Sequence, residues 1–371
     1  MLVALFAAAS ALVPFGAATA AYRFSDFQGK PPVHVYKSAE KSPLGVTPAE
    51  IKKIYNLPAT GGKGTIALID AYDDVNMEND LAAFDKQFNL PSCTTANGCF
   101  EKHKMATSTT SNSGWAMETS LDVEWAHAIA PSAKILLVEA KTPSGANLLS
   151  AIDYATSRKD VVAISMSWGG AEFSDELSYD AHFVDNANSS TAFFASSGDD
   201  GAGASWPASS PNVVGVGGTS LELASSGTLI AESAWSGSGG GVSAYEKEPA
   251  YQTTYKISKA GGMRAIPDVS YDADPASGYP IYITTGTGSK AKGSWNTVGG
   301  TSAGAPQWAA IQALGGSTAL TKFYTDKAST STLKYFRDIT SGSNGTCQYY
   351  CDARKRYDYV TGLGSPQTTK F

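Results

Sequence analysis

Ser302 stands in a glycine-rich stretch, residues 299–306 (GGTSAGAP), that leads into an apolar segment of the kind that forms a buried helix. A serine at the N-terminal end of such a helix exposes its hydroxyl at the turn. Its own backbone N–H points the same way and can stabilise an oxyanion. Ser302 is therefore a candidate nucleophile, provided that another side chain takes its proton.

Histidine is the usual base for a serine nucleophile, and the chain has four: His34, His103, His127 and His182. None of them stands in a turn such as His-Gly-Thr, and His34 lies in the N-terminal leader. His127 and His182 fall on predicted helices, where packing or surface roles are the default. The sequence therefore does not favour a histidine base.

Two carboxylates offer another base. Glu118 and Asp122 are four residues apart on a predicted helix, so they share a face with Cβ atoms roughly 6 Å apart. Acids this close push their pKa values apart, so that a glutamate with a raised pKa can act as general base while the aspartate orients it. A solvated acidic face is the alternative, which apolar neighbours on the same helix weaken: Leu121, Val123, Trp125 and Ala126.

A third acid, Asp199, comes directly after a short apolar segment that predicts a buried strand. Open parallel sheets place functional groups where their strands end. A protonated aspartate there can donate a hydrogen bond to an oxyanion. Taken by itself, the segment is more typical of an ordinary turn.

These candidate residues need a scaffold, and the chain predicts one α/β domain. Short, continuous apolar segments predict strands that are buried on both faces, over residues 65–69, 133–138, 161–165, 191–195 and 213–216. Helical patterns separate them, over residues 76–88, 115–129, 147–157 and 174–188. The alternation predicts a mostly parallel central sheet flanked by helices on both faces. Residues 217–300 are expected to form loops and short strands around a cleft.

The composition limits the classes of partner. With 42% hydrophobic and 17% charged residues the chain is globular, and a net charge of −6 without a basic stripe argues against nucleic acid. Residues 2–13 are almost wholly apolar and residues 18–20 (ATA) offer a cleavage site, which predicts a signal peptide over residues 1–20 and secretion. An N-terminal membrane anchor is the alternative. We expect no membrane association after signal removal, because no later apolar run reaches ~18 residues.

The four cysteines fall into two sequence-local pairs. In an oxidising compartment we expect the disulfides Cys93–Cys99 and Cys347–Cys351, one of three possible connectivities. A zinc site is the alternative, which the lack of any Cys-x-x-Cys spacing disfavours. Residues 21–45 have little periodicity and contain two adjacent prolines, which predicts an exposed leader.

Several motifs follow one another in the order found in one peptidase family: residues 118–125 (ETSLDVEW), 165–169 (SMSWG), 197–199 (SGD), 239–243 (GGGVS), 267–270 (PDVS) and 300–306 (GTSAGAP). Together they make the chain resemble the sedolisins, or serine-carboxyl peptidases, over about residues 45–366. The resemblance implies a subtilisin-like peptidase domain over residues 46–371. It also implies a secreted serine-type endopeptidase that hydrolyses proteins at acidic pH through a Ser-Glu-Asp triad and an acyl-enzyme.

The resemblance also implies roles for single residues. Ser302 would be the nucleophile, Glu118 the general base and Asp122 the residue that orients it. Asp199 would stabilise the oxyanion together with the Ser302 N–H.

Three further residues are implied around this centre. Trp168 and Gly169 would line the substrate cleft. Asp70, at the end of the first predicted strand, would extend the proton network to Glu118.

One calcium ion is implied near the C-terminus, because residues 336–340 and 357–364 resemble the two halves of the family's site. The ligands would be two carboxylates and several backbone carbonyls, which suit this hard cation: Asp338, Asp358, Ile339, Arg354 and Arg356. The chain departs from the family here, because residues 354–356 (RKR) replace the usual glycines.

A second departure concerns the N-terminal side. Sedolisins usually carry a long pro-domain, whereas about 25 residues precede the catalytic start here, too few to bury a core. We expect a monomer that acts on proteins or peptides and folds unaided or with a pro-domain in trans. A sequence that starts late is the remaining explanation.

Three rival functions stay open. A conventional subtilisin shares the fold but needs a histidine base. A tripeptidyl aminopeptidase of the same family differs in how far its cleft extends. A non-catalytic descendant would be a binding protein, which is disfavoured because all four catalytic positions carry working groups.

Overall fold

The structure is a computed structural model that describes residues 22–107, 110–184, 191–316, 320–325 and 335–369. The predicted signal peptide, residues 1–20, lies outside the described part. Within the described residues, no helix combines the length and the apolar character that crossing a bilayer requires.

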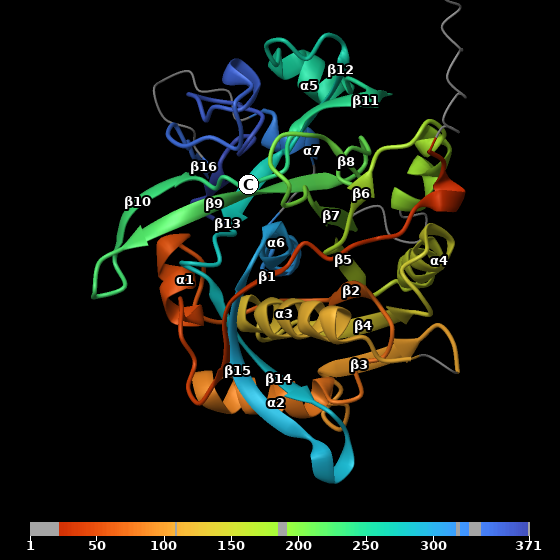
Figure 1. Cartoon of the computed structure of the whole chain (residues 1–371), viewed down its shortest axis with the longest axis vertical. Coiled ribbons are helices and arrows are strands. Elements are labelled where there is room, and N and C mark those ends of the chain that lie inside the picture. Colours follow the sequence, from red (N-terminus) through yellow and green to blue (C-terminus); the bar gives the residue numbers. More distant parts are fainter. Residues whose placement is uncertain (1–21, 108–109, 185–190, 317–319, 326–334, 370–371) are drawn as a thin grey trace, which may run out of the picture.

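An eight-stranded sheet runs through the centre of the molecule (Figure 1). Its strands are β2 (Thr65–Ala71), β3 (Phe100–Lys104), β4 (Lys134–Ala140), β5 (Val161–Met166), β7 (Ala192–Ser196), β9 (Val214–Leu223), β10 (Leu229–Ala234) and β13 (Val269–Asp272). The spatial order is β10-β9-β7-β5-β2-β4-β3, and β13 also pairs with β9. Every pair is parallel except β10 with β9.

Helices cover both faces of this sheet. The α-helices are α1 (Pro48–Ile54), α2 (Met77–Phe88), α3 (Ser113–Ile129), α4 (Gly145–Thr156), α5 (Ala250–Tyr255), α6 (Gly304–Ala313) and α7 (Leu320–Phe323). All seven residues of β2 are buried, and they alternate between two cores. Ile66 and Leu68 join the core of α3 and α6, whereas Ile69 joins the core under α4. The predicted α/β architecture with helices on both faces is confirmed.

One predicted helix takes a different form. Residues 174–188 were expected to be α-helical, but the structure has a 3-10 helix at Glu176–Phe183. Only its two end residues are buried, so it lacks the apolar face that stabilises a longer α-helix by packing.

The stretch expected to form loops and short strands, residues 217–300, holds more β-structure than predicted. β14 (Tyr279–Thr285) and β15 (Lys292–Gly299) form an antiparallel hairpin, and β1 (His34–Glu40) pairs with the outer side of β15. This hairpin packs on α3, where the Trp125 indole donates to the Pro280 carbonyl over 3.0 Å. The shorter strands form pairs: β6 (Gly170–Ala171) with β8 (Ser205–Trp206), β11 (Gly241–Lys247) with β12 (Met263–Ile266), and β16 (Phe336–Arg337) with β17 (Ser365–Pro366).

The segment before α1 does not project freely from the domain. In Figure 1 it crosses the molecule from the side of α4 to β15. Phe27 is fully buried and Gly29 is buried as well, whereas the side chains of residues 34–39 are exposed. The expectation of an exposed leader over residues 21–45 is therefore wrong for Phe27 and Gly29, because other parts of the fold cover them.

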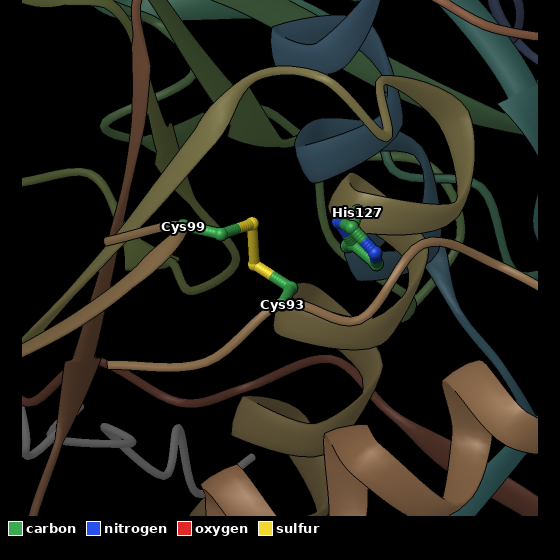
Figure 2. Close-up of side chains that lie close together, drawn as sticks. All are labelled: Cys93, Cys99 and His127. Atoms are coloured by element: carbon green, nitrogen blue, oxygen red, sulfur yellow. A yellow bond between two sulfur atoms is a disulfide. The ribbon is translucent and has the colours of Figure 1, made fainter. Parts of the chain in front are cut away.

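Both expected disulfides are present, Cys93–Cys99 and Cys347–Cys351. Figure 2 shows the first beside His127 of α3, and the sulfur and ring nitrogen atoms lie within 4.8 Å of one another. Because each sulfur is bonded to its partner, the zinc alternative has no thiolate ligand here. His127 Nε2 instead lies 2.9 Å from the Pro91 carbonyl, and burial lowers the pKa of this histidine to about 4.

Candidate active site

Ser302 lies in a 3-10 turn, Thr301–Ala303, between the end of β15 and the start of α6. The chain enters this turn through Gly300, which has a φ of 132°. A side chain there would overlap with Pro32 and Asp199, so only glycine fits. Ser302 is fully buried, and its hydroxyl donates a hydrogen bond to the Pro32 carbonyl over 2.8 Å.

Glu118 points into the same site from α3. Its carboxyl group is fully buried, and neither oxygen accepts a hydrogen bond from a residue that the structure describes. Burial first, and then the charge of Asp70, raises the pKa of Glu118 well above its usual range, while the nearby Ser302 hydroxyl lowers it. The Ser302 proton is directed at Pro32, so Glu118 remains an unused acceptor beside the nucleophile.

Asp122 lies one helical turn after Glu118 and is also fully buried. Its Oδ1 accepts a hydrogen bond from the Ser167 hydroxyl over 2.7 Å, and the same hydroxyl lies 3.3 Å from the Ser302 carbonyl oxygen. Burial, followed by the charges of Asp70 and Glu118, raises the pKa of Asp122 well above its usual range. Ser167 thus links the acid pair to the turn of the nucleophile.

Asp70 lies in β2, behind the acid pair. Both of its oxygens are buried and have no hydrogen-bond partner among the described residues. Burial and the charge of Asp74 raise the pKa of Asp70 to about 7. Asp74 lines a pocket of about 150 Å³ with Asn112 and Thr284, so the carboxyl groups of Glu118, Asp70 and Asp74 connect the buried centre with this pocket.

Asp199 approaches the nucleophile from the end of β7. Its Oδ1 accepts hydrogen bonds from the Thr301 N–H over 2.8 Å and from the Thr301 hydroxyl over 2.7 Å. Its Oδ2 lies 3.0 Å from Nε2 of His34. Burial raises the pKa of Asp199, and His34 and Thr301 counteract this rise.

Trp168 and Gly169, which were expected to line the substrate cleft, lie against the segment of residues 27–32. Gly169 pairs with Lys30 in an antiparallel bridge, with N···O distances of 3.0 and 3.2 Å. The Trp168 indole is fully buried and donates to the Ile69 carbonyl over 2.9 Å. Together with the hydrogen bond from Ser302, this pairing holds the leader across the candidate nucleophile in an extended conformation.

The four histidines take different positions. His34 lies beside Asp199. The sequence did not predict this contact, because the leader has no periodic pattern from which its position on the domain could be inferred. His103 stacks on Tyr154 with ring centroids 3.7 Å apart, and His182 Nδ1 lies 2.6 Å from Asp153. Of the four, and within the described part of the chain, only His34 contacts a residue of the candidate active site.

The residues of the expected calcium site come together in the C-terminal part of the chain. Both oxygens of Asp338 accept from the Arg356 N–H, at 2.9 and 3.0 Å, and Asp358 Oδ2 accepts from the Arg354 N–H over 2.9 Å. Burial raises the pKa of Asp358 to about 7. A bound cation would relieve this cost of burying the carboxylate.

The surroundings fit a hard cation. Among the described residues, no backbone N–H donates to the carbonyl oxygens of Ile339 or Arg354, which leaves them available as ligands. The Arg354 guanidinium turns away, because it lies 3.0 Å from Asp352 and over the Tyr349 ring. The site thus offers oxygen ligands, although arginines stand where the family has glycines.

We compared the sequence with models of known protein families, and one of them matches. The model of the Subtilase family matches residues 103–335, which is more than half of the sequence. The chain belongs to the subtilase family.

Two curated peptidases are similar to most of this chain. Sedolisin of Pseudomonas sp. (strain 101) is 28% identical, over 88% of this chain and 60% of its own length. Kumamolisin of Bacillus sp. (strain MN-32) is 30% identical, over 89% of this chain and 63% of its own length. The chain therefore spans about three fifths of the length of these curated relatives.

A solved structure agrees. The structure of "Pseudomonas sedolisin (serine-carboxyl proteinase) complexed with two molecules of pseudo-iodotyrostatin" has a TM-score of 0.72 at 27% identity, and the match covers 89% of this chain and 96% of that one. A lanthipeptide protease at 15% identity and a TM-score of 0.51 shares the fold alone. The resemblance to the sedolisins and the subtilisin-like fold are thereby confirmed.

Proposed function

We propose that the chain is a secreted serine-carboxyl endopeptidase that hydrolyses peptide bonds of proteins at acidic pH. One observation carries the proposal: four groups of the expected kinds converge where a backbone carbonyl lies against the nucleophile. They are Ser302, Glu118, Asp122 and Asp199.

In the proposed reaction, Ser302 Oγ attacks the carbonyl carbon of a substrate and its proton passes to Glu118. Glu118 takes this proton in its ionised form, and the raised pKa makes that carboxylate a stronger base. Asp122 orients Glu118 and shares its charge. Glu118 then protonates the leaving amine as the C–N bond breaks, and water hydrolyses the ester by the same steps in reverse.

Asp199 has the role of an electrostatic stabiliser. When protonated, it donates a hydrogen bond to the oxyanion, together with the Ser302 N–H. Burial raises its pKa, which favours the protonated form in acid. The proposal therefore includes an acidic pH optimum. Asp70 would pass protons between Glu118 and the pocket at Asp74.

The path of residues 27–32 favours an endopeptidase over a tripeptidyl peptidase. Counting back from Pro32, whose carbonyl meets Ser302, the third residue is Lys30, which pairs with Gly169. The segment does not stop there: the Gly29 N–H donates to the Pro143 carbonyl over 2.8 Å, and Gln28 bridges Ser144. A cleft that continues past the third residue accepts the interior of a long chain.

Calcium, secretion and a monomeric state belong to the same proposal. When bound, calcium would link the two halves of the C-terminal site through Asp338 and Asp358, with carbonyl oxygens of Ile339, Arg354 and Arg356 as further ligands. Its role is structural, so added Ca²⁺ should raise the melting temperature of wild type but not of Asp358→Asn. Secretion is supported by the two disulfides, because disulfides persist in oxidising compartments such as the extracellular space. The chain folds unaided or with a separate pro-domain that acts in trans.

The test is cleavage of a denatured protein from pH 3 to 8 by wild type, Ser302→Ala and Glu118→Gln, with Ca²⁺ present and the products sequenced. We expect internal cuts with an acidic optimum in wild type and none in the two variants. Release of N-terminal tripeptides alone would support the tripeptidyl peptidase. No cleavage by folded wild type would support a binding protein.

A further inference from the structure

Residues 27–32 lie in the cleft as a bound peptide would. Burial alternates along them, because Phe27 and Gly29 are buried whereas Gln28 and Lys30 are exposed. This period of two is that of an extended strand with one face against the protein. The backbone contacts to Pro143, Ser144 and Gly169 fix the register, so Phe27 is five residues before the one whose carbonyl meets Ser302.

Phe27 fills an aromatic pocket. Its ring centroid lies 4.8 Å from that of Trp206, 5.7 Å from that of Phe173 and 6.3 Å from that of Trp168, with tilted or edge-to-face geometry. Aromatic rings in these geometries attract one another beyond the effect of the apolar area that they bury. The pocket therefore suits a planar aromatic side chain.

Gly170 makes room for this ring. A Cβ atom on Gly170 would lie 2.8 Å from Cε2 of Phe27, closer than real Cβ atoms come to other atoms. Gly29, two residues after Phe27 on the buried face, is confined in a similar way. Its Cβ would lie 2.7 Å from Leu148 Cδ1 and 3.3 Å from Trp168. The cleft thus takes a large ring at one position and a very small residue two positions later.

We infer that the pocket formed by Trp168, Gly170, Phe173 and Trp206 is a distal substrate-binding site for an aromatic side chain five residues before the residue attacked by Ser302. Residues 27–32 and a substrate compete for it, because both need the same wall at Gly169 and the same place at Ser302. This inference rests on the proposed function and names a preference of the same cleft.

The test measures peptide binding without catalysis. The double variant Ser302→Ala, Phe27→Ala cannot acylate, and its own leader has lost the ring that holds it. Three acetylated hexapeptides serve as probes: the sequence of residues 27–32, Phe-Gln-Gly-Lys-Pro-Pro; Ala-Gln-Gly-Lys-Pro-Pro; and Ala-Phe-Gly-Lys-Pro-Pro, in which the ring moves to the exposed position of Gln28. Calorimetry gives their affinities.

We expect the first peptide to bind at least tenfold more tightly than the other two. Adding Gly170→Val, which fills the pocket, should abolish this difference, whereas the control Gly114→Ala, a glycine with no close neighbour beyond its own helix cap, should preserve it. Equal affinities, or no binding to the folded double variant, would overturn the inference and leave Phe27 as a fixed core residue.

Catalysis provides an independent readout. In wild-type digests of denatured proteins, Phe, Tyr and Trp should be enriched five residues before the residue whose carbonyl is attacked. Phe27→Ala should raise the rate, because the leader then competes less well. Cleavage without enrichment would refute the pocket and leave the proposed function intact. Tight binding of the first peptide without any cleavage by wild type would support the pocket and refute the proposed function.

Discussion

Two groups of buried carboxylates in this molecule differ in how their oxygens are used. Asp268 is fully satisfied, because Arg264 contacts both of its oxygens and the Tyr324 hydroxyl and the Gly215 N–H supply further hydrogen bonds of 2.7 and 2.8 Å. Glu118 is equally buried, but within the described parts of the chain neither of its oxygens has a hydrogen-bond partner.

The difference distinguishes carboxylates that stabilise the fold from carboxylates that can take part in proton transfer. A carboxylate with every oxygen paired stabilises the fold and has no capacity left to take a proton. A buried carboxyl group without partners costs stability, but its raised pKa lets it exchange protons with a neighbour. Asp70 shares this second character, with both oxygens unpaired.

The largest effect is expected for Glu118→Gln. The variant keeps the shape of the side chain but removes the proton acceptor, so kcat/KM should fall by about 10⁴-fold with little loss of stability. The matched control is Glu124→Gln on the same helix, since Glu124 accepts hydrogen bonds from the Tyr282 N–H and serves the fold. Similar losses of kcat/KM in both variants would contradict the assignment of Glu118 to proton transfer and of Glu124 to the fold.

Asp268→Asn should act in the opposite way. Removing one partner of a buried ion pair leaves Arg264 uncompensated and costs about 3–5 kcal/mol of unfolding free energy, measured by urea denaturation. The exposed pair of Glu101 and Arg158 is the control, and Glu101→Gln should cost less than about 1 kcal/mol. Activity per folded molecule should survive in both. An Asp268→Asn protein that is stable but inactive would contradict the account.

The stability of the protein should depend on pH through Asp70. Its pKa is about 7 in the folded state and 3.8 without the fold, so the folded state holds this proton more tightly. Its contribution is fully present below pH 4 and is lost as the pH rises through 7. Asp70→Asn should therefore flatten the decline in unfolding free energy between pH 4 and 8, by about 1 kcal/mol or more. An unchanged slope would mean that Asp70 is not the titrating group.

The smallest effect is expected for His34→Ala. Nε2 of His34 lies 3.0 Å from Asp199 Oδ2, and His34 belongs to the segment that we propose substrates displace. The rate on a protein substrate should change by less than about threefold. A loss of 10³-fold or more would instead make His34 the general base, as in a conventional subtilisin.

The part of the site that can be predicted from the sequence depends on how close the contacting residues are along the chain. Glu118 and Asp122 share a helix and Ser302 follows a glycine turn, so spacing and residue type suffice to pick them out. The same holds for the strands of the central sheet, which are apolar on both faces.

Other features depend on contacts between distant segments. The leader has no periodicity, and its place is decided by Gly169 and by the glycine at position 300, more than a hundred residues away. The link from Ser167 to Asp122 spans 45 residues, and that from Thr301 to Asp199 spans 102. Such partners are ordinary serines and threonines in the sequence, and only the fold gives them a role.

The most direct test of the account is the rate at which a fluorophosphonate labels Ser302, followed by intact mass at several pH values. The reagent bonds to Ser302 Oγ only as its proton leaves, so the rate reports the base. We predict labelling of wild type, none of Ser302→Ala, and at least 100-fold slower labelling of Glu118→Gln at every pH. Labelling of Glu118→Gln at the wild-type rate would contradict the assignment of Glu118 as the base.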